Sequence, residues 1–113
     1  MMLVRAVIKP FKLEDVLEAL RDLDIRGVTA IEVSGFGRQG GHVEMYRGIE
    51  YRIDFLPKIE LEIVVTDELV DDVLAAICNG AGTGKIGDGK IWVVPVDRVM
   101  RVRTGEEGPN AVA

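Results

Sequence analysis

Two stretches of the chain share nearly the same pattern of hydrophobic and polar positions. They are EDVLEAL at 14–20 and DDVLAAI at 71–77, and both place apolar residues at the spacing of an amphipathic helix. An apolar, strand-like run precedes each of them, LVRAVI at 3–8 and IELEIVV at 59–65. This internal repeat predicts a strand followed by a helix, twice in succession.

Each predicted helix is followed by a further strand, GVTAIEV at 27–33 and KIWVVPV at 90–96. Pro10 suits the turn that precedes the first helix, and Thr66 or Asp67 can cap the second. Two strand–helix–strand units in about 100 residues most often form one antiparallel sheet with both helices on one face. We therefore expect an α+β sandwich of the ferredoxin-like βαββαβ type.

The length of 113 residues suffices for one hydrophobic core but not for two, so we expect residues 1–113 to form a single domain. In the last predicted strand, Val93, Val94 and Val96 make both faces apolar, although the helices are expected to cover only one. An apolar sheet face left in water favours association. We therefore expect an oligomer.

The connection over 35–58 is much longer than a hairpin turn requires, and connections of this length are usually functional or disordered. Its first part, GFGRQGG at 35–41, is flexible and basic, whereas IEYRIDF at 49–55 alternates apolar and charged residues. With Gly48 in a turn, residues 43–45 can pair with 49–55. The pattern predicts an extended finger.

Three side chains of this segment invite a chemical interpretation. Tyr46 and Tyr51 are either recognition residues or modification targets, or they pack against each other within the hairpin. His42 is the only histidine, and the sequence shows no partner for acid–base chemistry near it, so we expect it to face solvent. Both interpretations of the tyrosines stay open at this point.

Composition places the chain among ordinary soluble proteins, with 48% hydrophobic and 29% charged residues. No apolar run approaches the about 20 residues of a membrane span, and the first residues do not form a signal-peptide pattern. The single cysteine, Cys78, has no partner for an internal disulfide, so we expect it to be buried in a cytoplasmic protein. The net charge of −5 argues against nucleic acid as the main partner.

The segment GTGKIGDGK at 82–90, called the glycine loop below, partly matches two nucleotide-binding patterns, G-x-G-x-x-G and G-x-x-x-x-G-K. Both patterns require a strand before the loop and a helix after it. Here the loop follows the second predicted helix and leads into the last strand, and Ile91 stands where a P-loop needs Ser or Thr for magnesium. Neither motif is present.

The glycine loop nevertheless retains the chemistry by which such motifs bind phosphate. Its four glycines expose backbone N–H groups that no side chain obstructs, and Lys85 and Lys90 add positive charge. Downstream, RVRTG at 101–105 alternates, so we expect Arg101 and Arg103 on one face of an extended segment. The loop favours phosphate binding over a mere mobile connection, whereas the two arginines suit either an anion or solvent.

Six stretches spread over nearly the whole chain occur in a characteristic order. They are IKPFKLEDV, GFGRQ, YRGIEY, DFLPK, TGKIGDGKI and RVRTGEE. Together they closely resemble the PII family of nitrogen-regulatory signal-transduction proteins. The resemblance implies a ferredoxin-like homotrimer with nucleotide sites in the clefts between subunits. It also implies a T-loop at about 37–55, a B-loop at about 82–90 and a C-loop at about 97–113.

By this resemblance, ATP and ADP compete for each nucleotide site. The implied nucleotide contacts are Thr29, Gly37, Arg38, Val64, Gly87, Asp88, Gly89, Lys90, Arg101 and Arg103. The resemblance implies that Arg101 and Arg103 reach the phosphates from the neighbouring subunit. It also implies that Thr29 and the backbone of Val64 border the adenine.

The resemblance further implies 2-oxoglutarate as a second effector, bound beside Mg-ATP. Gln39 would ligate the Mg²⁺ ion, and Lys58 would pair with a carboxylate of the effector, with the backbone of Gly87 nearby. Because the metal ion bridges ATP and 2-oxoglutarate, each ligand raises the affinity of the other. The chain departs from the family at Gly40, where relatives usually carry Lys, and a positive charge near the effector is thereby lost.

The implied function is that of a non-catalytic sensor of ATP, ADP and 2-oxoglutarate that regulates nitrogen assimilation. Its implied targets are an ammonium transporter, acetylglutamate kinase, a modifying nucleotidyltransferase and transcriptional regulators; only the transporter would bring it to a membrane. Tyr51 matches the tyrosine that some relatives carry as a uridylylation or adenylylation target. Ile49 stands where the family usually has a small residue, so phosphorylation of a serine there has no counterpart.

Two other functions on the same fold fit the sequence less well. An acylphosphatase-like enzyme needs an arginine and a phosphate cradle after the first strand, and KPFKLED at 9–15 offers neither. An assembly module of the copper-tolerance type leaves the glycine loop unexplained, and one cysteine with one histidine makes a poor metal site. The sensor is therefore the favoured hypothesis.

Overall fold

The structure is a computed structural model that describes residues 1–36, 42–46, 49–53 and 55–112, with side chains in 1–36 and 55–112. The strands are β1 (Met2–Ile8), β2 (Thr29–Phe36), β3 (His42–Tyr46), β4 (Ile49–Ile53), β5 (Phe55–Val65) and β6 (Gly89–Pro95). The helices are α1 (Leu13–Asp22), α2 (Val70–Ala81) and the short α3 (Pro109–Val112), with 3₁₀ turns η1 (Pro10–Lys12) and η2 (Asp67–Leu69).

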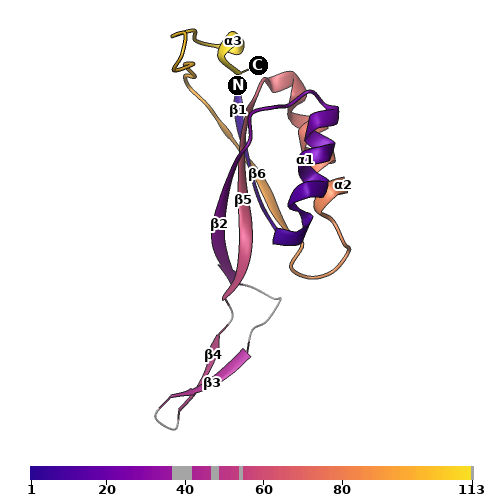
Figure 1. The fold of residues 1–113 in the computed structure, drawn as a ribbon, viewed down its shortest axis with the longest axis vertical. Coiled ribbons are helices and arrows are strands. Elements are labelled where there is room, and N and C mark those ends of the chain that lie inside the picture. The colour runs from indigo at the N-terminus through magenta and orange to yellow at the C-terminus, as the bar shows by residue number, and fades with distance from the viewer. Residues whose placement is uncertain (37–41, 47–48, 54, 113) are drawn as a thin grey trace.

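Four strands form an antiparallel sheet in the order β2-β5-β1-β6, and α1 and α2 both cover one face of it (Figure 1). In this sheet Val4 of β1 lies between Ile63 of β5 and Val93 of β6. This is the predicted ferredoxin-like α+β fold. The predicted strands were too short at two ends, since β2 continues to Phe36 and β5 already begins at Phe55.

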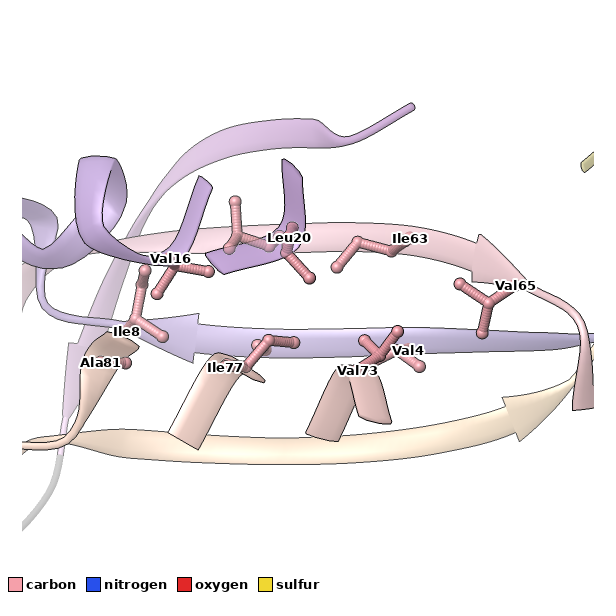
Figure 2. Close-up of a cluster of buried hydrophobic side chains, with 11 residues drawn as sticks. Val4, Ile8, Val16, Leu20, Ile63, Val65, Val73, Ile77 and Ala81 are labelled. Atoms are coloured by element: carbon pink, nitrogen blue, oxygen red, sulfur yellow. The ribbon is translucent and has the colours of Figure 1, made fainter. Parts of the chain in front are cut away.

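The hydrophobic core lies between the sheet and the two helices (Figure 2). Val16 and Leu20 of α1, and Val73 and Ile77 of α2, are buried at a spacing of four residues, so one face of each helix points at the sheet. The buried apolar residues are Val4, Ala6, Ile8, Val16, Leu20, Leu61, Ile63, Val65, Val73, Ile77 and Ala81. The repeat found in the sequence is thus the repeat that builds the core.

The starts of the helices follow the predicted turns only in part. Pro10 opens the turn η1, as expected from its fixed φ. The expected cap on the second helix was wrong, because η2 precedes α2 and the Thr66 side chain makes no capping hydrogen bond. The carboxylate of Asp67 instead accepts a hydrogen bond from the amino group of Met1 at 2.8 Å. The Asp67 side chain thus binds Met1 and makes no cap on α2.

The prediction that Cys78 is buried was also wrong. The buried positions of α2 are Val73, Ile77 and Ala81. Cys78 follows Ile77 by one residue, which is a rotation of about 100° around the helix axis, so its side chain turns away from the sheet and is exposed. The apolar character of Cys78 therefore did not predict its burial, because the orientation of the helix decides which side chains face the sheet.

Gly80 marks the place where α2 approaches the backbone of α1. A Cβ atom at Gly80 would lie 2.9 Å from the Cα of Val16 and 3.1 Å from the carbonyl oxygen of Asp15. We expect Gly80→Ala to lower the free energy of unfolding by about 1–2 kcal/mol, because overpacking against backbone outweighs the gain in helix propensity. Urea unfolding followed by circular dichroism measures this.

The neighbouring exposed position provides the control for Gly80→Ala. Asn79→Ala raises helix propensity without touching α1, so we expect it to leave the free energy of unfolding unchanged or slightly higher. A Gly80→Ala variant as stable as Asn79→Ala would contradict the close approach of the two helices.

Strands β3 and β4 form a separate antiparallel pair that projects beyond the sheet (Figure 1). Their register runs from His42 opposite Ile53 to Tyr46 opposite Ile49, so the predicted finger is confirmed for these strands. At its base, Phe36 and Phe55 are register partners whose ring centroids lie 5.7 Å apart. The radius of gyration of 17.2 Å exceeds the about 13 Å of a compact domain of this size.

Among the described residues, no helix covers the sheet face opposite α1 and α2. It presents apolar side chains, of which Ile31, Trp92 and Val94 are 41%, 36% and 37% exposed. Hydrophobic side chains of this size on one sheet face form the kind of surface that another molecule covers. In the part of the chain that the structure describes, no helix has the length and apolar character needed to span a bilayer.

Candidate functional site

The glycine loop joins the end of α2 to the start of β6, as the sequence predicts. The backbone takes positive φ at Gly84, Gly87 and Gly89, with values of 81°, 97° and 109°. L side chains rarely adopt such angles, so the path of the loop depends on these glycines.

The carboxylate of Asp88 lies at the centre of the loop. One of its oxygens accepts hydrogen bonds from the backbone N–H groups of Thr83 and Gly84, at 2.7 and 2.8 Å. The other oxygen accepts hydrogen bonds from the ammonium group of Lys9, at 3.1 Å, and from the hydroxyl group of Thr83. Of the four glycine N–H groups that the sequence suggested for phosphate, that of Gly84 is therefore bound to a carboxylate of the protein itself, and that of Gly82 donates to the carbonyl oxygen of Cys78. This corrects the expectation for these two glycines.

These contacts change the acidity of Asp88. Hydrogen bonds from the hydroxyl and the backbone N–H of Thr83 hold the pKa of Asp88 far below its ordinary value of 3.8. The carboxylate is therefore ionised at neutral pH. Because the folded-state pKa is depressed, the network stabilises the fold at pH values above 3.8. That contribution is lost only as the pH falls through the lowered pKa.

Lys58 of β5 reaches the same loop from the sheet. Its side chain is buried, with 8% of the residue exposed, and its ammonium group donates a hydrogen bond to the carbonyl oxygen of Gly87 at 2.6 Å. Burial lowers the pKa of Lys58, and the positive charge of Lys9 lowers it further, while Asp88 acts in the opposite direction. A carboxylate arriving at Lys58 would find a partly desolvated cation, which is a favourable partner for an anion.

A hollow of about 510 Å³ opens beside Lys58 at this end of the sheet. Its lining comes from the first residue of η1, from β2 and from the start of β5: Pro10, Glu32, Val33, Ser34, Pro57, Lys58 and Ile59. Gly35 lies across the Lys58 side chain, where a Cβ atom would approach the Cγ of that lysine to 2.9 Å. Glycine at position 35 of β2 thus leaves room for the side chain of Lys58.

Three further predicted contact residues lie on the uncovered face of the sheet. Thr29 is opposite Glu62 of β5, Val64 is opposite Leu3 of β1, and Lys90 is opposite Val7 of β1. These positions alternate with the buried ones, so they project away from the helices. Thr29 and Val64 mark one end of this face, while Lys90 and the glycine loop mark the other.

Lys90 and Glu60 are both register partners of Val7, and Val64 lies four positions after Glu60 along β5. Four residues of a strand span about 13 Å. One end of this surface is apolar, and the other end carries the backbone donors of the glycine loop. A surface of this length suits an elongated ligand with an anionic group at one end.

Arg101 and Arg103 are not on one face of an extended segment, and that prediction was wrong. The N–H of Gly105 donates to the carbonyl oxygen of Arg101 at 2.8 Å, and Gly105 has a φ of 73°, so residues 101–105 close into a turn. The guanidinium of Arg101 donates to the carbonyl oxygen of Asn110 at 3.0 Å and lies 3.6 Å from the carboxylate of Glu106. Arg103 is exposed.

Within one chain these arginines are far from the glycine loop. The loop enters β6 at Gly89, and the C-terminal segment leaves the same strand after Pro95, at the opposite end of the sheet (Figure 1). The fold therefore does not bring the arginines together with the loop of their own chain. The β2 strand, by contrast, ends at Phe36 near the loop end, because Gly35 packs on Lys58.

Several predicted site residues lie outside the described residues or lack a described side chain. Gly37, Arg38 and Gln39 belong to the first group. Tyr51 is in β4, opposite Glu44, and its side chain is not described. Lys9 is a residue of the site that was not predicted, although a lysine directly before Pro10 and after an apolar strand is a visible signal in the sequence.

A family model and the similar sequences carry the same description, nitrogen regulatory protein P-II. Residues 1–106 match the family model described as nitrogen regulatory protein P-II. Over 109 residues, which are 96% of this chain, the sequence is 62% identical to the nitrogen regulatory protein P-II of Pasteurella multocida and covers 97% of it. It is 59% identical over the same length to nitrogen regulatory protein P-II 1 of Escherichia coli strain K12, again with 97% of that protein covered.

A solved structure resembles the fold described above. It is the crystal structure of Arabidopsis thaliana PII bound to citrate, with a TM-score of 0.81 and 40% sequence identity. The match covers 98% of this chain and 88% of the Arabidopsis chain. The similarity thus includes the sheet, both long helices and the segment that carries the glycine loop.

Proposed function

Because the chain belongs to the nitrogen regulatory protein P-II family, we propose that it is a non-catalytic signal protein that binds ATP or ADP and responds to 2-oxoglutarate. Its relatives are named as regulatory proteins. The observation that carries this proposal is the arrangement at one end of the sheet. There, the buried Lys58 lines a hollow and donates to the carbonyl oxygen of Gly87 in the glycine loop, and the buried Lys9 donates to Asp88 of the same loop.

The nucleotide would lie along the uncovered face of the sheet. Its adenine would rest at the end marked by Thr29 and Val64, and its phosphates would meet the N–H groups of Gly87 and Gly89 with the charge of Lys90. The about 13 Å between the two ends matches the reach from a base to a polyphosphate. Gly37 and Arg38, which follow β2, complete the proposed phosphate contacts.

Assembly into a homotrimer would supply what one chain lacks. The uncovered apolar face would be buried against the other subunits. Arg101 and Arg103, which lie at the wrong end of their own sheet, would reach the phosphates of the neighbouring subunit's nucleotide. The chain mass of 12.4 kDa makes the trimer easy to distinguish from the monomer.

The effector site would use Lys58 and the hollow beside it. A carboxylate of 2-oxoglutarate would pair with the Lys58 ammonium, near the backbone of Gly87. The Arabidopsis relative is bound to citrate, another carboxylate, which supports an anion site in this family. The amide oxygen of Gln39 is the type of ligand that Mg²⁺ accepts alongside phosphate, and the metal would bridge nucleotide and effector.

The finger would carry the signal to target proteins. Binding at its base changes which surfaces the finger presents. An ammonium transporter, acetylglutamate kinase, a modifying nucleotidyltransferase and transcriptional regulators are the target classes that the family suggests. The protein would act in the cytoplasm and reach a membrane only through the transporter, and Tyr51 is the candidate site for uridylylation or adenylylation.

Isothermal titration calorimetry tests this function directly. We expect 2-oxoglutarate to bind in the presence of Mg-ATP and to give no signal without nucleotide or with ADP. We expect Lys58→Met to weaken 2-oxoglutarate binding at least about 100-fold, because the variant leaves a buried carboxylate unpaired. ATP affinity should change much less.

Lys12 of η1 provides the matched control, because its ammonium group pairs with the carboxylate of Asp15 at 3.4 Å and does not line the hollow. Lys12→Met should bind 2-oxoglutarate as the unaltered protein does. Absence of any nucleotide binding by the unaltered protein would refute the proposed function. Binding of ATP without a 2-oxoglutarate response would restrict the function to sensing ATP and ADP, with Gly40 as the first residue to restore to lysine.

A further inference from the structure

Lys9 is as deeply buried as Lys58, but the proposed ligand contacts do not use it. It follows β1 directly, and 8% of the residue is exposed. Its ammonium group donates to the carboxylate of Asp88 at 3.1 Å and to the hydroxyl of Thr83 at 3.3 Å. Both partners belong to the glycine loop, so this one side chain joins the end of β1 to both ends of the loop.

Asp88 is poorly suited to hold phosphate with its side chain. Its carboxylate already accepts hydrogen bonds from the backbone N–H of Thr83 and Gly84, from the Thr83 hydroxyl and from Lys9. A negative charge next to a polyphosphate also repels it unless a cation is close by. The carboxylate therefore shapes the loop from inside, and Lys9 neutralises its charge.

We propose that Lys9 is a positioning residue of the phosphate-binding loop, which it holds in its binding conformation through Asp88. The inference rests on the proposed function only for the identity of the ligand, an oligophosphate such as that of ATP or ADP. The loop geometry is a property of the unliganded chain.

A loop of this kind needs such a support. Three of its four glycines, Gly84, Gly87 and Gly89, take positive φ, and glycine has no side chain to limit its backbone angles. Ordering a loop upon binding weakens affinity, whereas a loop ordered beforehand avoids that loss. Lys9 and Lys58 hold the loop at two separate points, one at Asp88 and the other at the carbonyl oxygen of Gly87.

The test compares Lys9→Met with Lys12→Met, which removes a lysine three residues away that pairs with Asp15. The first measurement is hydrogen exchange of the Thr83 and Gly84 amides by NMR in the unliganded protein. We expect exchange in Lys9→Met to be at least about tenfold faster, because Asp88 loses its anchor. The second is calorimetry with ATP, in which we expect affinity to fall at least about tenfold. Lys12→Met should match the unaltered protein in both.

Two further variants separate positioning from folding. Asp88→Asn keeps the shape and one acceptor oxygen but loses the charge that Lys9 binds, so it should reproduce the faster exchange of the Thr83 and Gly84 amides. Lys9→Arg keeps the positive charge and should restore ATP affinity in part. Should Lys9→Met fail to fold, the Asp88→Asn and Lys9→Arg measurements decide the question alone.

The outcomes distinguish this inference from the proposed function. If the unaltered protein binds no ATP, the proposed function fails, and amide exchange still tests the role of Lys9. If Lys9→Met, or Asp88→Asn in its place, keeps the amide exchange of the unaltered protein, the positioning role is overturned. Weaker ATP binding by Lys9→Met with unchanged exchange also overturns it, because Lys9 would then act on the ligand directly.

Discussion

Replacing Gly89 with alanine is expected to remove most of the stability of the protein. A Cβ atom at this position would lie 1.8 Å from the carbonyl oxygen of Val7 and 2.9 Å from its carbonyl carbon. Both atoms belong to the backbone of β1, which pairs with β6 through Ile8 opposite Gly89. No rotamer relieves such an overlap, since Cβ is fixed by the backbone.

The expected effect combines two terms. The φ of 109° at Gly89 is strained for any L side chain, which costs about 1–3 kcal/mol, and the displacement of β1 or β6 adds about 1–3 kcal/mol more. We expect Gly89→Ala to lower the free energy of unfolding by about 3 kcal/mol or more, measured by urea unfolding. Any folded fraction should lack ATP binding in calorimetry, because the loop moves together with the start of β6.

Gly84 offers the control, since it also has a positive φ, of 81°, but nothing lies within 4 Å of its Cβ position. Gly84→Ala should therefore show only the strain of the backbone angle, about 1–2 kcal/mol. Equal losses of stability in the two variants would mean that contact with β1 does not decide the role of Gly89.

Replacing Trp92 with glutamate is expected to convert the proposed trimer into monomers. Trp92 lies on the uncovered face of the sheet, opposite Arg5 of β1, and Val94 lies beside Leu3 on the same face. A carboxylate on each subunit would be buried close to its copies in the assembly, and unpaired buried charges are strongly unfavourable. Sedimentation equilibrium should find a trimer for the unaltered protein and 12.4 kDa for the variant.

The variant should also lose nucleotide affinity, because the proposed site uses Arg101 and Arg103 of a neighbouring subunit. Ala75→Glu is the matched control, since Ala75 is exposed on α2, on the helical side of the sheet. It should remain a trimer that binds ATP. A Trp92→Glu protein that stays trimeric would show that the uncovered face is not the interface.

Features that depend on neighbouring residues could be predicted from the sequence. The repeat of EDVLEAL and DDVLAAI predicted both long helices and, with the apolar runs around them, the ferredoxin-like sheet. The order of helix, glycine loop and strand excluded a P-loop and a dinucleotide fold, and the structure has this order. Hydrophobic periodicity and turn residues carry such information because they act over a few residues of chain.

Features that depend on distant residues required the tertiary structure. Asp88 meets Lys9, 79 positions away, and Lys58 meets Gly87, 29 positions away, only because the sheet register places both lysines at the loop end. The sequence alone suggested that the N–H groups of all four loop glycines were open to phosphate, whereas the fold engages that of Gly84 with Asp88 and that of Gly82 with the carbonyl oxygen of Cys78.

Two predictions that failed, those for Cys78 and Arg101, have different origins. Cys78 is exposed because the rotation of α2 is set by Val73 and Ile77 against the sheet, not by the character of Cys78. Arg101 lies in a turn because Gly105 bonds back to it. The sequence by itself determined the order and type of the elements, since local periodicity and turn chemistry specify them. The tertiary structure alone decided which charges meet, because strand register and helix rotation follow from packing of the whole core.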